Sequence, residues 1–132
     1  MTNLNEHYFQ LLGLDDDWQV DCVDLAMMDK TVTIRLSFCG DRPTCPECDG
    51  SCNLKDHAPE RTWRHLDTMQ FETRIVARTP RVKCESCGVK TCAVPWAAKS
   101  SRFTLMFEAF AIEVINAAAN VKAAAEVLRL SW

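Results

Sequence analysis

Two short cysteine hooks indicate a metal site in this chain. Cys45 and Cys48 are separated by two residues, and so are Cys84 and Cys87. At that spacing a tight turn directs both sulfurs toward one metal ion, with Zn–S bonds of about 2.3 Å. Four thiolates in two hooks form a closed tetrahedral set that leaves no coordination position for water or substrate. The pattern therefore predicts one structural Zn²⁺ ion bound by Cys45, Cys48, Cys84 and Cys87.

Two other uses of the cysteines are alternatives to zinc binding. Redox dithiols usually occur as a single pair beside a βαβ pattern, which this sequence does not show. Disulfides would suit the even number of eight cysteines. The segment 1–14, however, lacks the basic stretch and long apolar run of a signal peptide. These observations favour a reducing cytoplasm and reduced, metal-bound thiols.

One other cysteine and two histidines are further candidate zinc ligands. Cys52 is close enough in sequence to compete as a ligand. Imidazole also suits zinc, but strand or surface positions are preferred for the two histidines. The remaining cysteines are expected to pack as small apolar side chains. The two histidines are His57 and His65, and the remaining cysteines are Cys22, Cys39 and Cys92.

Charge is segregated along the chain, although the net charge is only −3. Residues 1–30 hold seven acidic residues against Lys30 alone, whereas residues 61–102 hold nine basic residues against three acidic ones. The basic block fits a DNA phosphate backbone, but it equally fits a solvated sheet face balanced by the acidic segment. Charge alone leaves both interpretations open. No apolar run approaches the roughly 20 residues of a membrane span, so no membrane partner is expected.

The hydrophobic pattern predicts a short helix and then a series of strands. Period-two alternation over 18–38 indicates an antiparallel hairpin that turns at Asp29-Lys30. The polar segment 51–60 is expected to be loop or short irregular strand. The 35 residues between Cys48 and Cys84 exceed the usual ribbon spacing of about 15 to 20, which suggests an inserted hairpin. The expected elements are a helix at 6–14, strands at 62–67 and 71–79 around a turn at 69–70, and a strand at 81–83.

The period changes to that of helices after residue 100. Apolar residues at i, i+3, i+4, i+7, i+8 and i+11 from Phe103 predict one helix with a core-facing stripe, capped by Ser101 or Thr104. Asn120 is a cap for a second helix over 121–128. Ser131 would cap a third, the recognition helix of a helix-turn-helix that stops short here. A solitary helical hairpin is the alternative.

The expected fold class is α+β, a zinc-ribbon-like antiparallel β meander followed by a C-terminal helical hairpin, the truncated helix-turn-helix. Residues 1–40 would form the N-terminal short helix and β-hairpin. Residues 41–98 would form the zinc-binding ribbon with its inserted hairpin, and residues 99–132 the incomplete helix-turn-helix.

Several motifs in one order resemble a known family. The segment from Cys45 to Glu108 resembles the N-terminal zinc-binding domain of bacterial insertion-sequence transposases of the ISL3 family, and Val121 to Trp132 is similar to the start of the helix-turn-helix that follows there. The matching motifs are Cys45-Pro46-Glu47-Cys48, the segment 61–67 (RTWRHLD), the segment 80–89 (PRVKCESCGV), Val94-Pro95-Trp96-Ala97, Ser101-Arg102-Phe103-Thr104-Leu105 and Phe107-Glu108.

The resemblance implies a non-enzymatic module that recognises the terminal inverted repeats of a mobile element in double-stranded DNA. Catalysis by an acidic, metal-binding triad would lie in a separate domain, and several copies would meet in the transposition complex. The protein would act in the bacterial cytoplasm, at the nucleoid when bound to DNA. The alternative is a structural zinc ribbon for protein–protein interaction or self-association. The expected phosphate contacts are Arg61, Arg64, Arg74, Arg78, Arg81 and Lys83.

Overall fold

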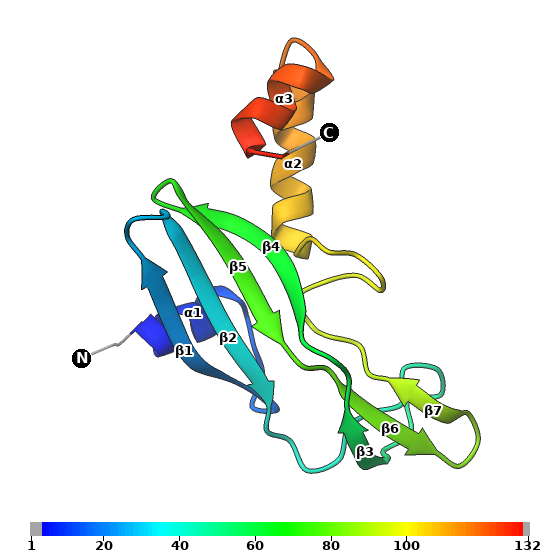
Figure 1. Cartoon of the computed structure of the whole chain (residues 1–132). Helices are drawn as coiled ribbons and strands as arrows, with labels where there is room; N and C mark the ends of the chain where they lie inside the picture. Colours follow the sequence, from blue (N-terminus) through cyan, green and yellow to red (C-terminus); the bar gives the residue numbers. More distant parts are fainter. Residues whose placement is uncertain (1–3, 131–132) are drawn as a thin grey trace.

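The computed structural model describes residues 4–130 of the 132-residue chain. Figure 1 shows a four-stranded sheet in the middle of an elongated molecule, with a small three-stranded sheet at one end and a pair of helices at the other. The expected α+β class is confirmed. In chain order the elements are α1 (Leu4–Leu11), β1 (Trp18–Ala26), β2 (Thr31–Phe38), β3 (Asn53–His57), β4 (Arg61–Thr68), β5 (Phe71–Ala77), β6 (Pro80–Cys84), β7 (Gly88–Thr91), α2 (Leu105–Ala117) and α3 (Val121–Leu128).

The four-stranded sheet has the order β1-β2-β5-β4 and is built from two hairpins. Lys30 in the first turn and Met69 and Gln70 in the second have positive φ, so both turns fall where the sequence predicts them. The hairpins meet through β2 and β5, which pair in parallel with Ile34 opposite Ile75. This parallel pair departs from the expected all-antiparallel meander. It also places strands from the segments 1–40 and 41–98 in one sheet.

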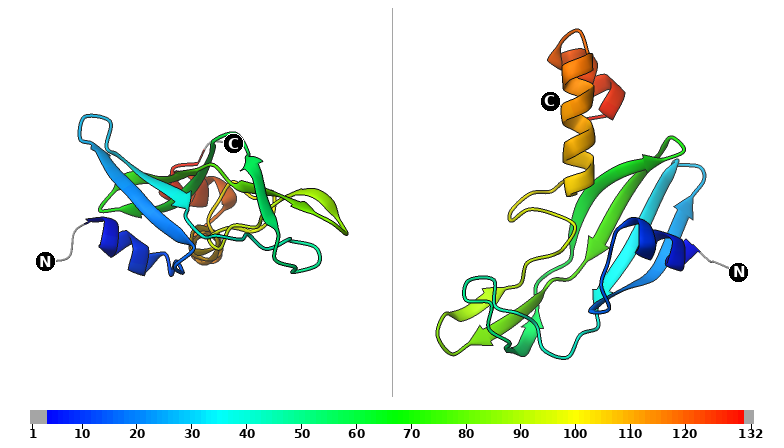
Figure 2. Two further views of the ribbon diagram at one scale, coloured as in Figure 1. Left: turned by 90° about the horizontal axis from the view of Figure 1, so that it is seen from below. Right: turned by 180° about the vertical axis from the view of Figure 1, so that it is seen from behind.

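One face of this sheet forms the main core. The alternation in β2 buries Val32, Ile34 and Leu36, as the period-two pattern predicts. Figure 2 shows α1 lying across that face, where Tyr8 is buried and its hydroxyl lies 2.7 Å from Thr68 Oγ1. The centre is filled by three tryptophans whose rings meet edge to face, with centroids 4.7 Å apart for Trp18–Trp96 and 5.3 Å for Trp63–Trp96.

The second sheet has the order β3-β6-β7; the first cysteine hook precedes β3, and the second lies in the turn between β6 and β7. The polar segment expected as loop or irregular strand contains β3, which pairs antiparallel with β6. Only two residues separate β5 from β6, so one stretch of chain runs from the large sheet into the small one (Figure 1). The two sheets are therefore joined by nearly continuous extended backbone.

The C-terminal helices begin at the expected caps. The Thr104 hydroxyl accepts a hydrogen bond from the backbone N–H of Phe107, and the Asn120 side chain accepts one from Ala123. The prediction that the apolar stripe of α2 faces a core is wrong for most of the helix. Within α2 only Phe107 of the stripe is buried, whereas Met106 and Phe110 are 45% and 44% exposed. The reason is that α2 projects beyond the sheet (Figure 1). None of the helices between residues 4 and 130 has the length and apolar character that a bilayer crossing requires.

Candidate zinc centre and nucleic-acid interface

The first hook is a tight turn closed by its own backbone. The Asp49 N–H donates to the Cys45 carbonyl over 3.0 Å, and the Cys45 N–H donates to the Gly50 carbonyl over 2.9 Å. Asp49 has φ 61°, a left-handed conformation that aspartate tolerates better than most residues. These hydrogen bonds bring Cys45 and Cys48 to the same side of the turn.

The second hook connects β6 to β7. Cys84 is the last residue of β6 and pairs with Gly88, the first of β7. Gly88 has φ 82°, the left-handed conformation expected at this position, which glycine adopts without steric cost. The hairpin thus presents Cys84 and Cys87 toward the first hook.

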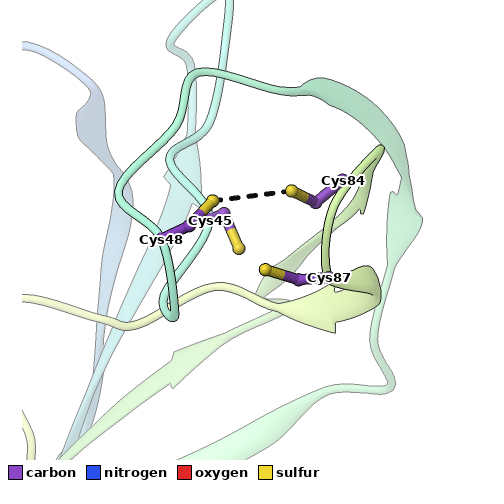
Figure 3. A group of neighbouring side chains, drawn as sticks. All are labelled: Cys45, Cys48, Cys84 and Cys87. Atoms are coloured by element: carbon purple, nitrogen blue, oxygen red, sulfur yellow. Dashed lines mark hydrogen bonds between the residues drawn. The ribbon is translucent and has the colours of Figure 1, made fainter.

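The four hook sulfurs converge on one point. All four lie within 4.8 Å of one another, and those of Cys48 and Cys84 are 3.6 Å apart (Figure 3). Four sulfurs about 2.3 Å from a central zinc ion stand about 3.8 Å apart at the corners of a tetrahedron. The observed spacing and the all-thiol donor set therefore fit Zn²⁺. A salt bridge of 3.0 Å between Glu47 and Lys90 also links the first hook to β7.

The backbone of the second hook prepares one sulfur for metal binding. The N–H groups of Cys87 and Ser86 hydrogen-bond to the Cys84 sulfur and lower the pKa of that thiol to about 6. Such hydrogen bonds favour the thiolate, which is the form that binds metal. Removal from solvent acts in the opposite direction on Cys87 and raises the pKa of its thiol to about 12. The backbone hydrogen bonds therefore favour the thiolate form of Cys84.

The other candidate ligands lie outside this group of four sulfurs. Cys52 is buried beside Cys45 and Cys84, but the four-sulfur group does not include it. Cys92 is half-buried, and burial raises the pKa of its thiol to about 11. Cys22 is also half-buried, whereas Cys39 is exposed and does not pack as a small apolar side chain as expected. His57 is exposed on β3.

His65 is buried, and it supports a helix instead of binding metal. Its Nδ1 atom lies 2.8 Å from the hydroxyl of Thr104, the residue that caps α2. Burial lowers the pKa of His65 to about 4, so the ring is neutral at pH 7. A neutral ring can accept the Thr104 proton while Thr104 accepts from Phe107. Nothing in the local sequence indicates this pairing, because the two residues lie on different elements.

Four of the expected phosphate contacts follow the extended stretch from β5 to β6. Arg74 and Lys83 are exposed on these strands, Arg78 is exposed in the link, and Arg81 is partly exposed. Arg81 pairs with Asp56 at 3.1 Å, and Arg78 donates to the carbonyls of His57 and Ala58. Arg61 lies over the Trp63 ring at 4.6 Å and donates to the Ser101 carbonyl.

Arg64 differs from the other five arginine and lysine residues in this group. Its side chain is only 10% exposed and forms 2.8 Å salt bridges to both Asp67 and Glu72. It also donates to the Leu128 carbonyl over 3.2 Å and lies over the Phe107 ring. These partners engage both terminal nitrogens of the guanidinium, while its Nε is buried without a hydrogen-bond partner among the described residues, so we do not carry Arg64 into the proposed phosphate contacts. Its role is to join the sheet to α2 and α3.

Two arginines not included in the sequence-based set lie near Arg74. Arg102 and Arg129 line the same surface depression as Arg74, although they lie far apart along the chain. Arg102 belongs to the basic block, but no local pattern separates it from its neighbours. Arg129 ends α3 in a left-handed conformation, φ 57°. Only the fold brings these side chains together.

The cysteine geometry on a β-ribbon, followed by two capped helices, defines a zinc-ribbon protein with a helix-turn-helix region. Residues 41–87 match the family model described as the zinc-finger of transposase IS204/IS1001/IS1096/IS1165. Residues 92–132 match the model described as the helix-turn-helix domain of transposase family ISL3. The chain belongs to the ISL3 family of transposases, and zinc is the metal that its four-cysteine site fits. Neither the curated proteins nor the solved structures gave a match.

Proposed function

We propose that this region binds the terminal inverted repeats of an insertion sequence during transposition. The observation that carries the proposal is the presence of a zinc ribbon and a helix-turn-helix region, both of transposase type, in one chain. In a helix-turn-helix the second helix enters the major groove and the first crosses the backbone. We assign the backbone-crossing role to α3 and sequence recognition to the helix expected from Ser131, which lies outside the described residues.

The zinc ion has a structural part in this proposal. Cys45, Cys48, Cys84 and Cys87 are the proposed ligands, and their closed set supplies no position for a reacting group. Strand cleavage and transfer are assigned to a separate catalytic domain of the transposase. The proposed place of action is the bacterial nucleoid. The proposed phosphate contacts are Arg61, Arg74, Arg78, Arg81 and Lys83.

A binding experiment tests the proposal directly. With protein that includes the complete recognition helix, fluorescence anisotropy would compare a duplex carrying the inverted repeat that brackets the coding gene with a shuffled duplex of equal length and composition. We expect a preference of about tenfold, equivalent to about 1.4 kcal/mol or one well-placed base contact. We also expect affinity to fall steeply with salt, since phosphate contacts release counterions. Equal affinity for the two duplexes would contradict recognition of the repeat.

A second candidate function, self-association in the transposition complex, is favoured by the surface of α2. Leu105, Ile112 and Ile115 share one helix face and are 49%, 60% and 47% exposed. We propose a second copy of this chain as the occupant. Sedimentation velocity should show a concentration-dependent dimer that weakens in Ile112→Gln but not in Met28→Gln, which changes an exposed apolar side chain on the β1–β2 turn. A monomer at all concentrations would remove this candidate.

A further inference from the structure

A basic depression lies between the four-stranded sheet and the C-terminal end of α3. Its lining includes the guanidinium groups of Arg64, Arg74, Arg102 and Arg129, with Glu72 as the only carboxylate among the lining residues. Asp67 is adjacent and pairs with Arg64 and, at 3.8 Å, with Arg129. Four positive charges against two negative ones leave an excess of positive charge, although the whole chain carries −3.

Arg64 bridges the two carboxylates, and Arg74 and Arg129 share them, so the group of four arginines keeps an excess of positive charge. Arg64 contacts both Asp67 and Glu72 at 2.8 Å and is nearly enclosed. Arg74 is 48% exposed and shares Glu72 at 3.1 Å. Arg129 is 43% exposed, and one of its nitrogens donates to the Gln70 carbonyl. Both side chains are held in place while part of each guanidinium still faces solvent.

Arg102 is the least engaged member of the group. Its guanidinium lies 5.4 Å from the centroid of the Phe103 ring. Across residues 4–130, the structure gives its side chain no hydrogen bond and no carboxylate partner. The backbone at this point is nevertheless fixed, because the Arg64 N–H donates to the Arg102 carbonyl over 2.8 Å. An unpaired cation on a fixed backbone at the rim of a basic depression is arranged to receive an anion.

The position of the depression beside the helix-turn-helix region indicates which anion it would bind. Arg129 caps the C-terminus of α3, the helix to which we assign the backbone-crossing role within the helix-turn-helix region. Guanidinium groups bind phosphate through two parallel N–H donors. We propose that Arg74, Arg102 and Arg129 form a clamp for the phosphate backbone of duplex DNA beside the helix-turn-helix. The clamp rests on the proposed function and adds Arg102 and Arg129 to its contacts.

Salt-dependent binding measures the clamp. Arg102→Gln and Arg129→Gln should each reduce the slope of log affinity against log salt by about 0.9, and affinity at 0.15 M salt by about fivefold. Arg102→Lys should retain the slope because it retains the charge. Arg35→Gln is the matched control, since Arg35 is a 46% exposed arginine with two carboxylate partners that does not line the depression. Zinc content and circular dichroism of each variant would show that the fold is intact.

Each outcome has a distinct meaning. If the unaltered chain binds the duplex and both glutamine variants keep its slope and affinity, the clamp is wrong and the proposed function stands. If Arg35→Gln loses as much as Arg102→Gln, the effect is general electrostatics and the clamp is wrong as well. If the variants lose affinity for a polyglutamate chain as strongly as for DNA, the partner is an acidic protein. If the unaltered chain binds no duplex, the proposed function itself fails.

Discussion

At the scale of single residues, the four hook cysteines are unequal. Backbone N–H groups of Cys87 and Ser86 lower the pKa of the Cys84 thiol, whereas burial raises the pKa of the Cys87 thiol. A metal ion removes this difference, because a coordinating thiol is deprotonated outright. Binding of zinc would therefore place both sulfurs of this hook in the thiolate form.

We expect Cys84→Ser to lose the zinc ion and with it the small sheet. Structural zinc contributes about 10–16 kcal/mol to small domains, and a hydroxyl replaces thiolate poorly. Elemental analysis should fall from one zinc per chain to none. Cys39→Ser is the control, because Cys39 is exposed and outside the four-sulfur group. Full zinc content in Cys84→Ser would contradict the assigned ligand set.

His65 makes stability depend on pH. Its folded pKa, held at about 4 by burial, lies below the unfolded value of about 6.5. The unfolded chain therefore binds more protons between these values, so the contribution of His65 is complete above pH 6.5 and is lost as the pH falls toward 4. Urea unfolding should show about 2 kcal/mol less stability from this group at pH 5 than at pH 7.

The control for this prediction is His65→Gln, whose side chain does not titrate. Acid also protonates zinc-bound thiolates, so zinc content must be measured at each pH and the two pH slopes compared. The variant should be less stable than the unaltered chain at pH 7 but should lose less on acidification. Identical slopes would show that His65 is not the titrating group.

At the scale of elements, Arg64 links the C-terminal helices to the sheet. It lies on β4, pairs with Glu72 of β5, and donates to the carbonyl of Leu128 at the end of α3. Its backbone N–H and carbonyl bond to Arg102 and Thr104, which lead into α2. Arg64 thus contacts the segment that leads into α2 through its backbone and the end of α3 through its side chain.

We expect Arg64→Met to destabilise the chain by about 2–3 kcal/mol. The change leaves Asp67 and Glu72 without their main partner, and the cost is less than for a fully buried pair because both remain partly exposed. Arg35→Met should cost less than about 1 kcal/mol, since Arg35 also contacts two carboxylates but is 46% exposed. Hydrogen exchange should quicken in α3 for Arg64→Met alone. Equal effects of the two changes would contradict the assignment.

The elements were largely predictable from the sequence, and their partners were not. Alternation identified β1 and β2, and local caps identified Thr104 and Asn120, because these signals are short-range. The parallel contact of β2 with β5 involves residues about forty positions apart and leaves no periodic signal. The contacts of Arg64 and His65 depend on that packing, so charge and residue type alone indicated neither the ion pairs of Arg64 nor the Thr104 contact of His65.

At the scale of the whole molecule, the zinc centre and the helix pair lie at opposite ends of the large sheet (Figure 1). Cysteine spacing predicted the metal site because the spacing within each hook is a local signal, and the only long-range requirement is that the two hooks come together. The exposed surface of α2 could not be predicted, since an apolar stripe looks the same whether the helix lies on a core or projects past it. Extended backbone joins Arg74 to Lys83, a path of about 30 Å at 3.3 Å per residue.

Basic side chains at the two ends of this path should contact DNA at two separate places. About 30 Å corresponds to about nine base pairs at 3.4 Å each. Arg102 lies at the helix end, and Lys83 is exposed on β6 at the zinc end, without a carboxylate partner among residues 4–130. Hydroxyl-radical footprinting should therefore show two protected stretches about one helical turn apart. Arg102→Gln should remove protection from one stretch and Lys83→Gln from the other.

The double variant completes this prediction. Sites this far apart, with no shared partner, should contribute additively within about 0.5 kcal/mol, so the losses of affinity in Arg102→Gln and Lys83→Gln should multiply. Zinc content should stay at one per chain in all three variants, because neither residue contacts a hook sulfur. If both single variants remove the same protected stretch, or if Lys83→Gln leaves footprint and affinity unchanged, DNA lies only against the helix end.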